Sequence, residues 1–143
     1  GDKATVWGPY GKFWESFINH KDLIMIAGGI GITPFLSMLE KESRNASPRK
    51  ITLIYSVNNL EEAVFDKDIK TMISTVSSIT YLPYASNLQG RIDTDKIIDM
   101  TGFVTGKKIL ICGPDSMMNS LASQFLNLGI KNKDIIFEDF NFK

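Results

Sequence analysis

Two glycine-containing loops hold the residues whose types and spacing best suit chemistry. In the first loop, residues 28–34 read Gly-Gly-Ile-Gly-Ile-Thr-Pro. Glycines let a backbone approach a ligand closely and adopt positive φ angles, while Thr33 suits the N-cap of a helix and Pro34 its first position. The free N–H groups and positive dipole end of a helix that follows such a loop favour a pyrophosphate. The other interpretation is a tight strand-to-helix turn that binds nothing.

This first loop differs from two common nucleotide-binding motifs. Its glycine spacing is not that of G-x-G-x-x-G, and no acid stands at the end of the second predicted strand, where residues 55–59 read Tyr-Ser-Val-Asn-Asn. The sequence also has no G-K-S/T phosphate loop. The residues alone therefore predict a nucleotide-like ligand without identifying it further.

The second loop, residues 112–118, reads Cys-Gly-Pro-Asp-Ser-Met-Met. Like the first, it ends a predicted strand with a glycine and opens a helix with a proline. A lone cysteine at a strand end is commonly an inert buried residue. Its place at the predicted ligand-binding edge gives a functional role for Cys112 about equal weight.

These loops need a scaffold, and short apolar runs that alternate with helical segments provide one. We expect strands at residues 23–27, 51–57, 79–82, 109–112 and 134–137, and helices near 13–19 and at 34–41, 61–75, 93–100 and 114–128. Pro83 should interrupt the third strand, and Asp93 or Thr94 should cap the helix at 93–100. The alternation predicts an α/β fold with a doubly wound, five-stranded parallel sheet of order 3-2-1-4-5. Ligands of such sheets bind beyond the carboxyl ends of the strands, here at the loops after Ala27 and Cys112.

Composition argues against several classes of function. The 143 residues carry 16 basic and 16 acidic side chains, and this zero formal charge argues against a nucleic-acid partner. One Cys and one His cannot form a zinc site or an iron–sulfur cluster on their own, and the lack of a disulfide partner predicts a reducing, cytoplasmic compartment. Residues 23–39 are uncharged, but glycines and a Thr-Pro pair break this run before it reaches the roughly 20 residues of a membrane span. The first residue is Gly rather than Met, which indicates a piece of a longer polypeptide.

Five segments in order carry a resemblance to a known family. They are GPYGKF at 8–13, MIAGGIGITP at 25–34, GRI at 90–92, ILICGPDSMM at 109–118 and FEDFNFK at 137–143. Together they resemble the ferredoxin–NADP⁺ reductase family, and more closely the nicotinamide-binding half of its bacterial ferric-reductase-like members. The resemblance implies that residues 1–20 are the tail of an upstream FAD-binding barrel plus a connecting segment, and that residues 21–143 are a ferredoxin reductase-like NAD(P)-binding domain.

The resemblance also implies roles for individual residues. It implies that the first loop holds the dinucleotide pyrophosphate through Gly28, Gly29, Ile30, Gly31, Thr33 and Pro34. Thr33 would lie near the nicotinamide, and Cys112 would pack beside its reactive C4 carbon. Gly113, Pro114 and Met117 or Met118 would shape the cofactor groove. Glu138 and Phe140 resemble the acid and the aromatic residue that meet the flavin, so Cys112, Thr33 and Glu138 form the implied catalytic set.

The position that receives the cofactor's 2′ group departs from the family pattern. Relatives that prefer NADPH tend to place a Ser-Arg pair after the third strand, because arginine pairs with phosphate. Here the comparable residues are Ser86 and Asn87. Arg91 could substitute as the phosphate partner, or it could be an ordinary surface arginine. NADH and NADPH both stay open, with a slight preference for NADH.

The resemblance implies a function with one main alternative. The chain would be the NAD(P)H-binding module of a flavin-dependent reductase, passing electrons through FAD to a haem, ferric-iron or iron–sulfur acceptor. Such a protein would work in the cytoplasm or at the cytoplasmic face of a membrane. The alternative is a non-catalytic nucleotide-sensing or interaction domain with the same groove. A receiver-type signalling domain fits poorly, because no acidic pair follows the first strand.

Overall fold

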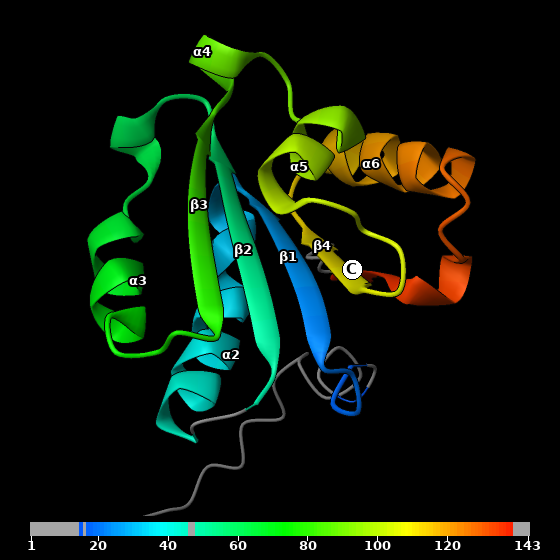
Figure 1. Cartoon of the computed structure of the whole chain (residues 1–143). Helices are drawn as coiled ribbons and strands as arrows, with labels where there is room; N and C mark the ends of the chain where they lie inside the picture. The colour runs from blue at the N-terminus through cyan, green and yellow to red at the C-terminus, as the bar shows by residue number, and fades with distance from the viewer. Residues whose placement is uncertain (1–14, 16, 46–47, 139–143) are drawn as a thin grey trace, which may run out of the picture.

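A five-stranded parallel sheet forms the centre of the computed structural model, which describes residues 15, 17–45 and 48–138. The strand order is β3-β2-β1-β4-β5, so the predicted fold class and order are confirmed (Figure 1). The strands are β1 (Asp22–Gly28), β2 (Lys50–Val57), β3 (Ile79–Ala85), β4 (Lys108–Cys112) and β5 (Ile135–Glu138). All four strand pairs are parallel, so every strand ends at the same edge of the sheet.

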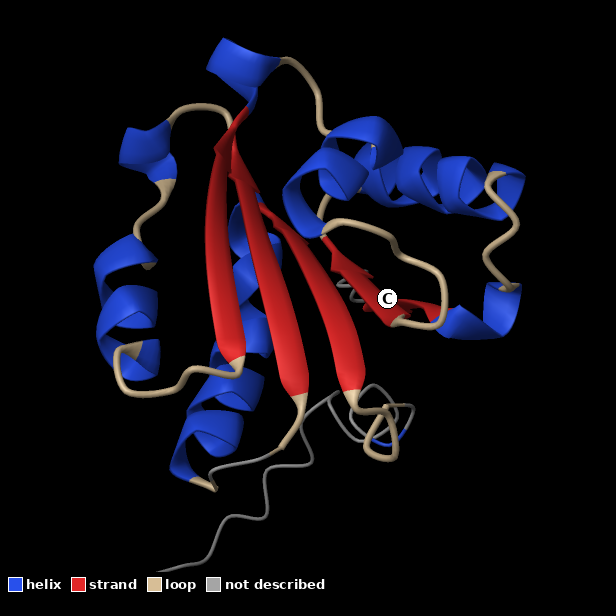
Figure 2. Cartoon of the chain, viewed as in Figure 1, coloured by secondary structure: helices blue, strands red, loops and turns tan. Residues whose placement is uncertain are grey.

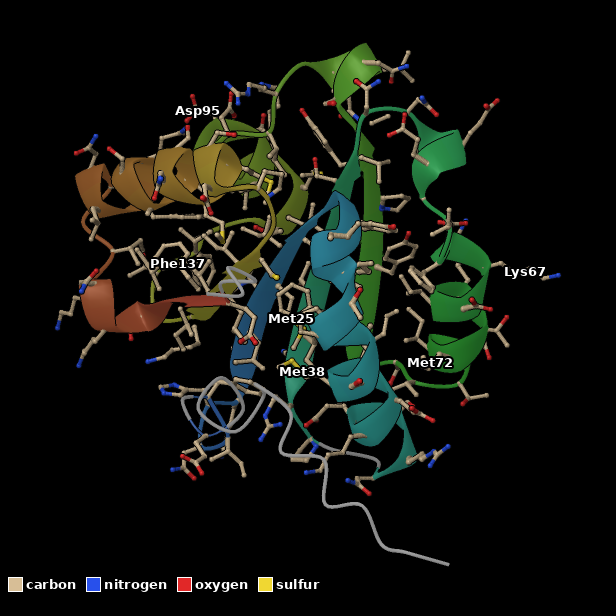
Figure 3. The ribbon with its side chains drawn as sticks, turned by 180° about the vertical axis from the view of Figure 1, so that it is seen from behind. Met25, Met38, Lys67, Met72, Asp95 and Phe137 are labelled. Atoms are coloured by element: carbon tan, nitrogen blue, oxygen red, sulfur yellow. The ribbon has the colours of Figure 1, made fainter. Side chains whose placement is uncertain are left out.

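Helices cover both faces of this sheet (Figure 2). The α-helices are α2 (Thr33–Arg44), α3 (Asp66–Ile73), α4 (Ser86–Gln89), α5 (Thr94–Thr101) and α6 (Asp115–Asn127), and the 3₁₀ turns are η1 (Gly29–Ile32), η2 (Leu60–Glu62) and η3 (Asn132–Asp134). Helices α2 and α3 pack on one face in a cluster that joins Met38 to Met25 of β1, and Figure 3 shows these two methionines close together. Helices α5 and α6 pack on the other face, around Ile97, Leu121 and Phe125.

The strand register brings the two loops together. Ala27 of β1 lies opposite Cys112 of β4, and Cys112 lies opposite Glu138 of β5. The chain then leaves β1 through η1 into α2, and leaves β4 through Gly113 and Pro114 into α6. Since β1 and β4 are the strands at which the order reverses, their loops open a crevice at the carboxyl edge.

The structure corrects two predicted elements. The helix expected at residues 61–75 is two elements, η2 and the shorter α3, because the Asn59 side chain bonds to Glu62 and the turn ends at Ala63. Pro83 does not interrupt the third strand, which continues to Ala85. Proline is tolerated there because β3 is an edge strand, with only β2 beside it.

The predicted helix starts are confirmed in one case and shifted in another. The Asp93 carboxylate caps α5 as expected, accepting a 2.9 Å hydrogen bond from the N–H of Lys96. Thr33 is not the N-cap of α2 but its first residue, and its hydroxyl donates to the carbonyl of Ile30 at 2.9 Å. The backbone N–H of Thr33 also donates to the carbonyl of Ile30 in the preceding η1 turn, and Pro34 is the second residue of the helix. Of the short helix expected near 13–19, residues 13, 14 and 16 lie outside the described residues, while residues 17–19 form a turn in which the N–H of His20 donates to the carbonyl of Phe17 at 2.8 Å.

Candidate functional site

Glycines allow the two loops to touch. A Cβ atom placed on Gly31 would lie 2.1 Å from the carbonyl oxygen of Cys112, a backbone atom that cannot move aside. A Cβ on Gly28 would lie 2.7 Å from the sulfur of Met117, and one on Gly113 would lie 2.5 Å from its methyl carbon. The missing side chains therefore let η1 pack directly on the end of β4 and let the end of β1 pack on the start of α6, which fixes the two loops as one rigid corner.

Gly29 serves the same corner in a different way. Its φ of +55° lies in the left-handed region that other residues rarely adopt, and no atom would contact an added Cβ. Gly29 and the neighbouring Ile30 side chain, which is 82% exposed, face outward. Gly29 makes the turn at the carboxyl end of β1, while Gly31 makes the contact behind it.

A cleft of about 460 Å³ opens beside this corner, between the carboxyl ends of the strands and α6. Its walls come from five segments that are far apart in sequence. They are Gly28 and Gly29, residues 56–58 with Glu62, Ser86, residues 91–93, and the α6 side with Pro114, Ser116, Met117, Ser120 and Gln124. In Figure 1 these segments meet around the upper end of the sheet, where α4 and α5 are labelled. This is the predicted ligand-binding edge.

The segment between β3 and α5 is held in place by its own hydrogen bonds. Tyr84 donates its hydroxyl to the carbonyl of Gly90 at 2.7 Å, and Gly90 adopts a φ of +78°. Lys96 donates to the carbonyl of Arg91 at 3.0 Å and lies 2.7 Å from Asp93. The pKa of the Asp93 carboxyl falls below its usual value because Lys96 bonds to it through both its ammonium and its backbone N–H. Asp93 is therefore a neutralised anion within the cleft wall.

Arg91 extends from this segment to the other wall. Its guanidinium donates to the Ser116 hydroxyl in the first turn of α6 at 3.5 Å, and the side chain is exposed. An arginine beside a helix N-terminus adds a full positive charge to the partial charge of the helix dipole. This end of the cleft can bind a phosphate group.

The α6 wall is a polar stripe that the sequence-based prediction did not include. Ser116, Ser120 and Gln124 recur at every fourth position and so lie on one side of the helix. Gln124 accepts hydrogen bonds from the N–H and hydroxyl of Thr94 at 3.0 and 3.3 Å and donates to Ser120 at 3.0 Å. The four-residue spacing of these polar residues is visible in the sequence and could have indicated a polar wall. The apolar residues of the same helix form a stronger periodic pattern, which indicates only the buried side.

Some of the predicted cofactor-binding residues line the cleft and others do not. Those that line the cleft are Gly28, Gly29, Ser86, Arg91, Pro114 and Met117. The others do not line it: Gly31, Pro34 and Met118 are buried, Gly113 is half-buried, and Ile30 and Asn87 are exposed. The backbone N–H of Asn87 donates to the carbonyl of Asn58 at 2.8 Å and so ties α4 to the end of β2. Phe140 is outside the described residues.

The three implied catalytic residues lie apart from the walls of this cleft. Cys112 is 0% exposed and belongs to the core between the sheet and α2. Glu138 is next to it on β5 and is 6% exposed, and burial raises the pKa of its carboxyl. Thr33 is exposed at the start of α2. Cys112 and Glu138 mark a second region, at the β4–β5 end of the carboxyl edge.

Neither a membrane span nor a metal centre is found within the described part of the chain. No helix there is long and apolar enough to cross a membrane. The same residues contain no cluster of three His, Cys, Asp or Glu side chains that could hold a metal ion.

Comparison with known proteins gives consistent similarities. The family model for the oxidoreductase NAD-binding domain matches residues 25–123. The chain is 29% identical to flavohemoprotein A of Dictyostelium discoideum and 26% identical to a component of the Na⁺-translocating NADH-quinone reductase of Serratia proteamaculans, with 98% of the chain covered in both cases. It spans 36% and 37% of the length of those relatives. Among solved structures, the flavohemoglobin of Malassezia yamatoensis with bound FAD and haem matches with a TM-score of 0.75 and 25% identity, over 85% of this chain and 32% of that one.

Proposed function

The chain belongs to the oxidoreductase NAD-binding domain family, and from this premise we propose that it is the nicotinamide-nucleotide-binding module of a flavin-dependent reductase. In this proposal it binds NADH or NADPH and places the nicotinamide for hydride transfer to FAD, which is held by another domain. Electrons then pass to an acceptor such as haem, ferric iron or an iron–sulfur protein. The setting is the cytoplasm or the cytoplasmic face of a membrane.

The observation that carries the proposal is the cleft at the glycine corner. A dinucleotide needs close backbone approach at its pyrophosphate, a cation beside it and hydrogen-bonding groups for its riboses. The corner supplies the first at Gly28 and Gly29, Arg91 supplies the second, and the serine hydroxyls supply the third. The volume of about 460 Å³ lies within the range of small-molecule sites.

The β4–β5 end of the same edge suits the reacting end of the nucleotide. Hydride transfer needs two rings held in contact and shielded from water, rather than a strong acid or base at the carbon. The fully buried side chain of Cys112 backs this end of the edge, and the exposed Thr33 can contact a ring placed there. Since the pKa of Glu138 is raised, its carboxyl keeps a proton to higher pH than an exposed glutamate and can supply one beside the flavin.

The same proposal includes a second, FAD-binding domain. FAD would supply the hydride acceptor, and its barrel domain would precede residue 21. Residues 1–20 would then form the end of that barrel and the connection to this domain. Phe140 would meet the flavin face. The relatives support this arrangement. Their names describe flavin- and haem-containing proteins, and each of these proteins extends well beyond the part that this chain matches.

A pair of tryptophan variants on α6 tests the nucleotide site. Ser120 lines the cleft and Ser123 does not, yet both are on the same helix. We expect NADH to bind the wild-type chain and Ser123→Trp equally in calorimetry, while Ser120→Trp fills the cleft and weakens binding at least about tenfold. Failure of the wild-type chain to bind NADH or NADPH would overturn the proposed function, and equal binding by both variants would overturn its location.

A second measurement separates the reductase from a non-catalytic nucleotide sensor. The flavin-containing polypeptide is mixed with saturating NADH, and flavin reduction is followed by stopped-flow absorbance. Rapid reduction is expected of a reductase. Tight nucleotide binding without flavin reduction would instead support the sensing or interaction domain.

A further inference from the structure

An acidic side chain reaches the cleft from the end of β2, although no acid follows that strand directly. Strand β2 ends at Val57, and the η2 turn brings Glu62 back to the cleft wall. The lining of the cleft also includes Asn58 and Ser86. The turn therefore restores a carboxylate to a region where residues 55–59 supply none.

Local bonds fix Glu62 in this position. The Asn59 side-chain amide donates to one carboxylate oxygen of Glu62 at 2.8 Å, and the N–H of Glu62 donates to the carbonyl of Asn59 at 3.0 Å. A carboxylate has about four acceptor positions, so most of them stay available for a ligand. Over residues 17–45 and 48–138, no lysine or arginine forms an ion pair with Glu62. Within these residues its negative charge has no neutralising partner.

The other charged residues of the cleft leave Glu62 to set the charge of its end of the lining. Asp93 is paired with Lys96, so Arg91 and Glu62 are the charged residues of the lining without an ion-pair partner in the described chain. Arg91 lies against Ser116 at the start of α6, beside the glycine corner. The residues that share the wall with Glu62, Asn58 and Ser86, are neutral.

The direction of a bound dinucleotide follows from this arrangement. Its phosphates lie at the corner beside Arg91, because the backbone approach and the cation are there. Neighbouring strands are about 4.8 Å apart, so the ends of β1 and β3 are separated by roughly 10 Å, a span that an adenosine group covers. The adenosine ribose then lies toward Ser86 and Glu62.

We propose that Glu62 makes this cleft selective for NADH over NADPH. This inference rests on the proposed function and deepens it. A ribose 2′-hydroxyl can donate a hydrogen bond to the carboxylate, which is a strong acceptor. A 2′-phosphate carries a charge of about −1.5 to −2 near neutral pH and would be repelled. Selectivity thus comes both from a contact with the correct ligand and from a penalty on the wrong one.

The variant Glu62→Gln tests this proposal in the 143-residue chain. Glutamine keeps the shape and an oxygen that can accept from Asn59, so the turn is preserved while the charge is lost. Calorimetric dissociation constants for NADH and NADPH are compared at one ionic strength. The wild-type chain should bind NADH at least about tenfold more tightly, and the substitution should reduce this ratio about five- to tenfold, mainly by tightening NADPH.

Two matched variants sharpen the test. Glu61 is exposed in the same turn but does not line the cleft, so Glu61→Gln should leave the ratio unchanged. Glu62→Lys should move the preference toward NADPH, and this shift should shrink with added salt. Circular dichroism melting confirms that each variant is folded.

The outcomes distinguish this inference from the proposed function. If the wild-type chain binds neither nucleotide, the proposed function fails. If it binds both equally, or if Glu62→Gln and Glu62→Lys keep the wild-type ratio, only the role of Glu62 is overturned.

Discussion

Two glycines of the first loop are required for opposite physical reasons, so their substitutions should differ. Gly31→Ala puts a Cβ 2.1 Å from the Cys112 carbonyl oxygen, so the loops must separate. We expect a loss of about 3 kcal/mol or more in unfolding free energy, together with loss of NADH binding. Gly29→Asn meets no atom, and asparagine tolerates a φ of +55°. That variant should lose about 1 kcal/mol or less.

Urea unfolding of both glycine variants provides the measurement. The ranking, with Gly31→Ala well below Gly29→Asn, is the expected result. Equal stability of the two variants would show that the two loops are not packed as tightly as the Gly31 contact requires.

Glu138 makes the unfolding free energy depend on pH, and the burial of its carboxyl determines the direction of that dependence. Its pKa is raised above the usual 4.5 because burial disfavours the charged form. The folded state therefore binds this proton more tightly than the unfolded state, and the unfolding free energy falls as pH rises from 4.5 through the raised pKa. Glu138→Gln removes this loss, so the variant should gain stability over wild type as pH increases from about 4 to 7.

Denaturant melts at a series of pH values would measure this effect. Asp66 and Asp93 have lowered pKa values, so their stabilisation is present above their unfolded pKa values and is lost as pH falls. Both act equally in wild type and in Glu138→Gln, and they cancel in the difference between them. A difference that does not change with pH would contradict the burial of this carboxyl.

At the level of single residues, sequence predicted the glycine corner better than the opposite wall. Gly28, Gly29 and Arg91 lie in recognisable segments, and all three line the cleft. Glu62 was missed because a 3₁₀ turn, rather than proximity in sequence, returns it to the strand end. Gln124 was missed because a four-residue spacing becomes a wall only when the helix is placed over the sheet.

At the level of elements, the sheet was predictable because apolar runs and crossover handedness restrict the topology strongly. Its order follows from these rules. The extent of individual elements was less predictable. β3 runs through Pro83 because it is at the edge, and α3 starts later because Asn59 and Glu62 bond locally. Both exceptions depend on spatial neighbours that the order of residues along the chain does not reveal.

A buried ion pair connects the residue before β2 to α2. Arg49 pairs with Glu42, and the two side chains are 13% and 6% exposed. The same guanidinium donates to the carbonyls of Ile18 and His20 at 2.5 and 2.8 Å and lies 5.9 Å from the Phe17 ring centroid. This arginine therefore joins residues 17–20, just before β1, to α2.

Removing one partner of this pair should be more costly than removing both charges. Arg49→Met leaves a buried carboxylate without its cation, and we expect a loss of about 3–5 kcal/mol in unfolding free energy. The double variant Arg49→Met/Glu42→Gln should recover part of this loss. Thermal and urea melts of the single and double variants measure the difference. A double variant no more stable than Arg49→Met would show that the backbone contacts, rather than the carboxylate, dominate.

At the scale of the whole molecule, the carboxyl edge of the sheet divides two tasks. The cleft over β1, β2 and β3 holds the groups suited to a nucleotide, while Cys112 and Glu138 occupy the β4–β5 end. Selection between NADH and NADPH can therefore change, through Glu62, without altering the residues proposed to lie beside the nicotinamide. The rigid glycine corner between the two ends keeps their relative position constant.

This division predicts how the 143-residue chain behaves alone. Under the proposed function it binds NADH, but the hydride acceptor belongs to another domain. Hydride transfer requires the reacting atoms to be about 3–3.5 Å apart in aligned rings, and free flavin in solution lacks that placement. We therefore expect the chain to bind NADH in calorimetry while nicotinamide absorbance decays no faster than in buffer, even with free FAD added. Fast flavin reduction should appear only when the flavin domain is present. Rapid NADH oxidation by the purified flavin-free chain would show that this domain reacts without a partner, and the proposed division of tasks would fail.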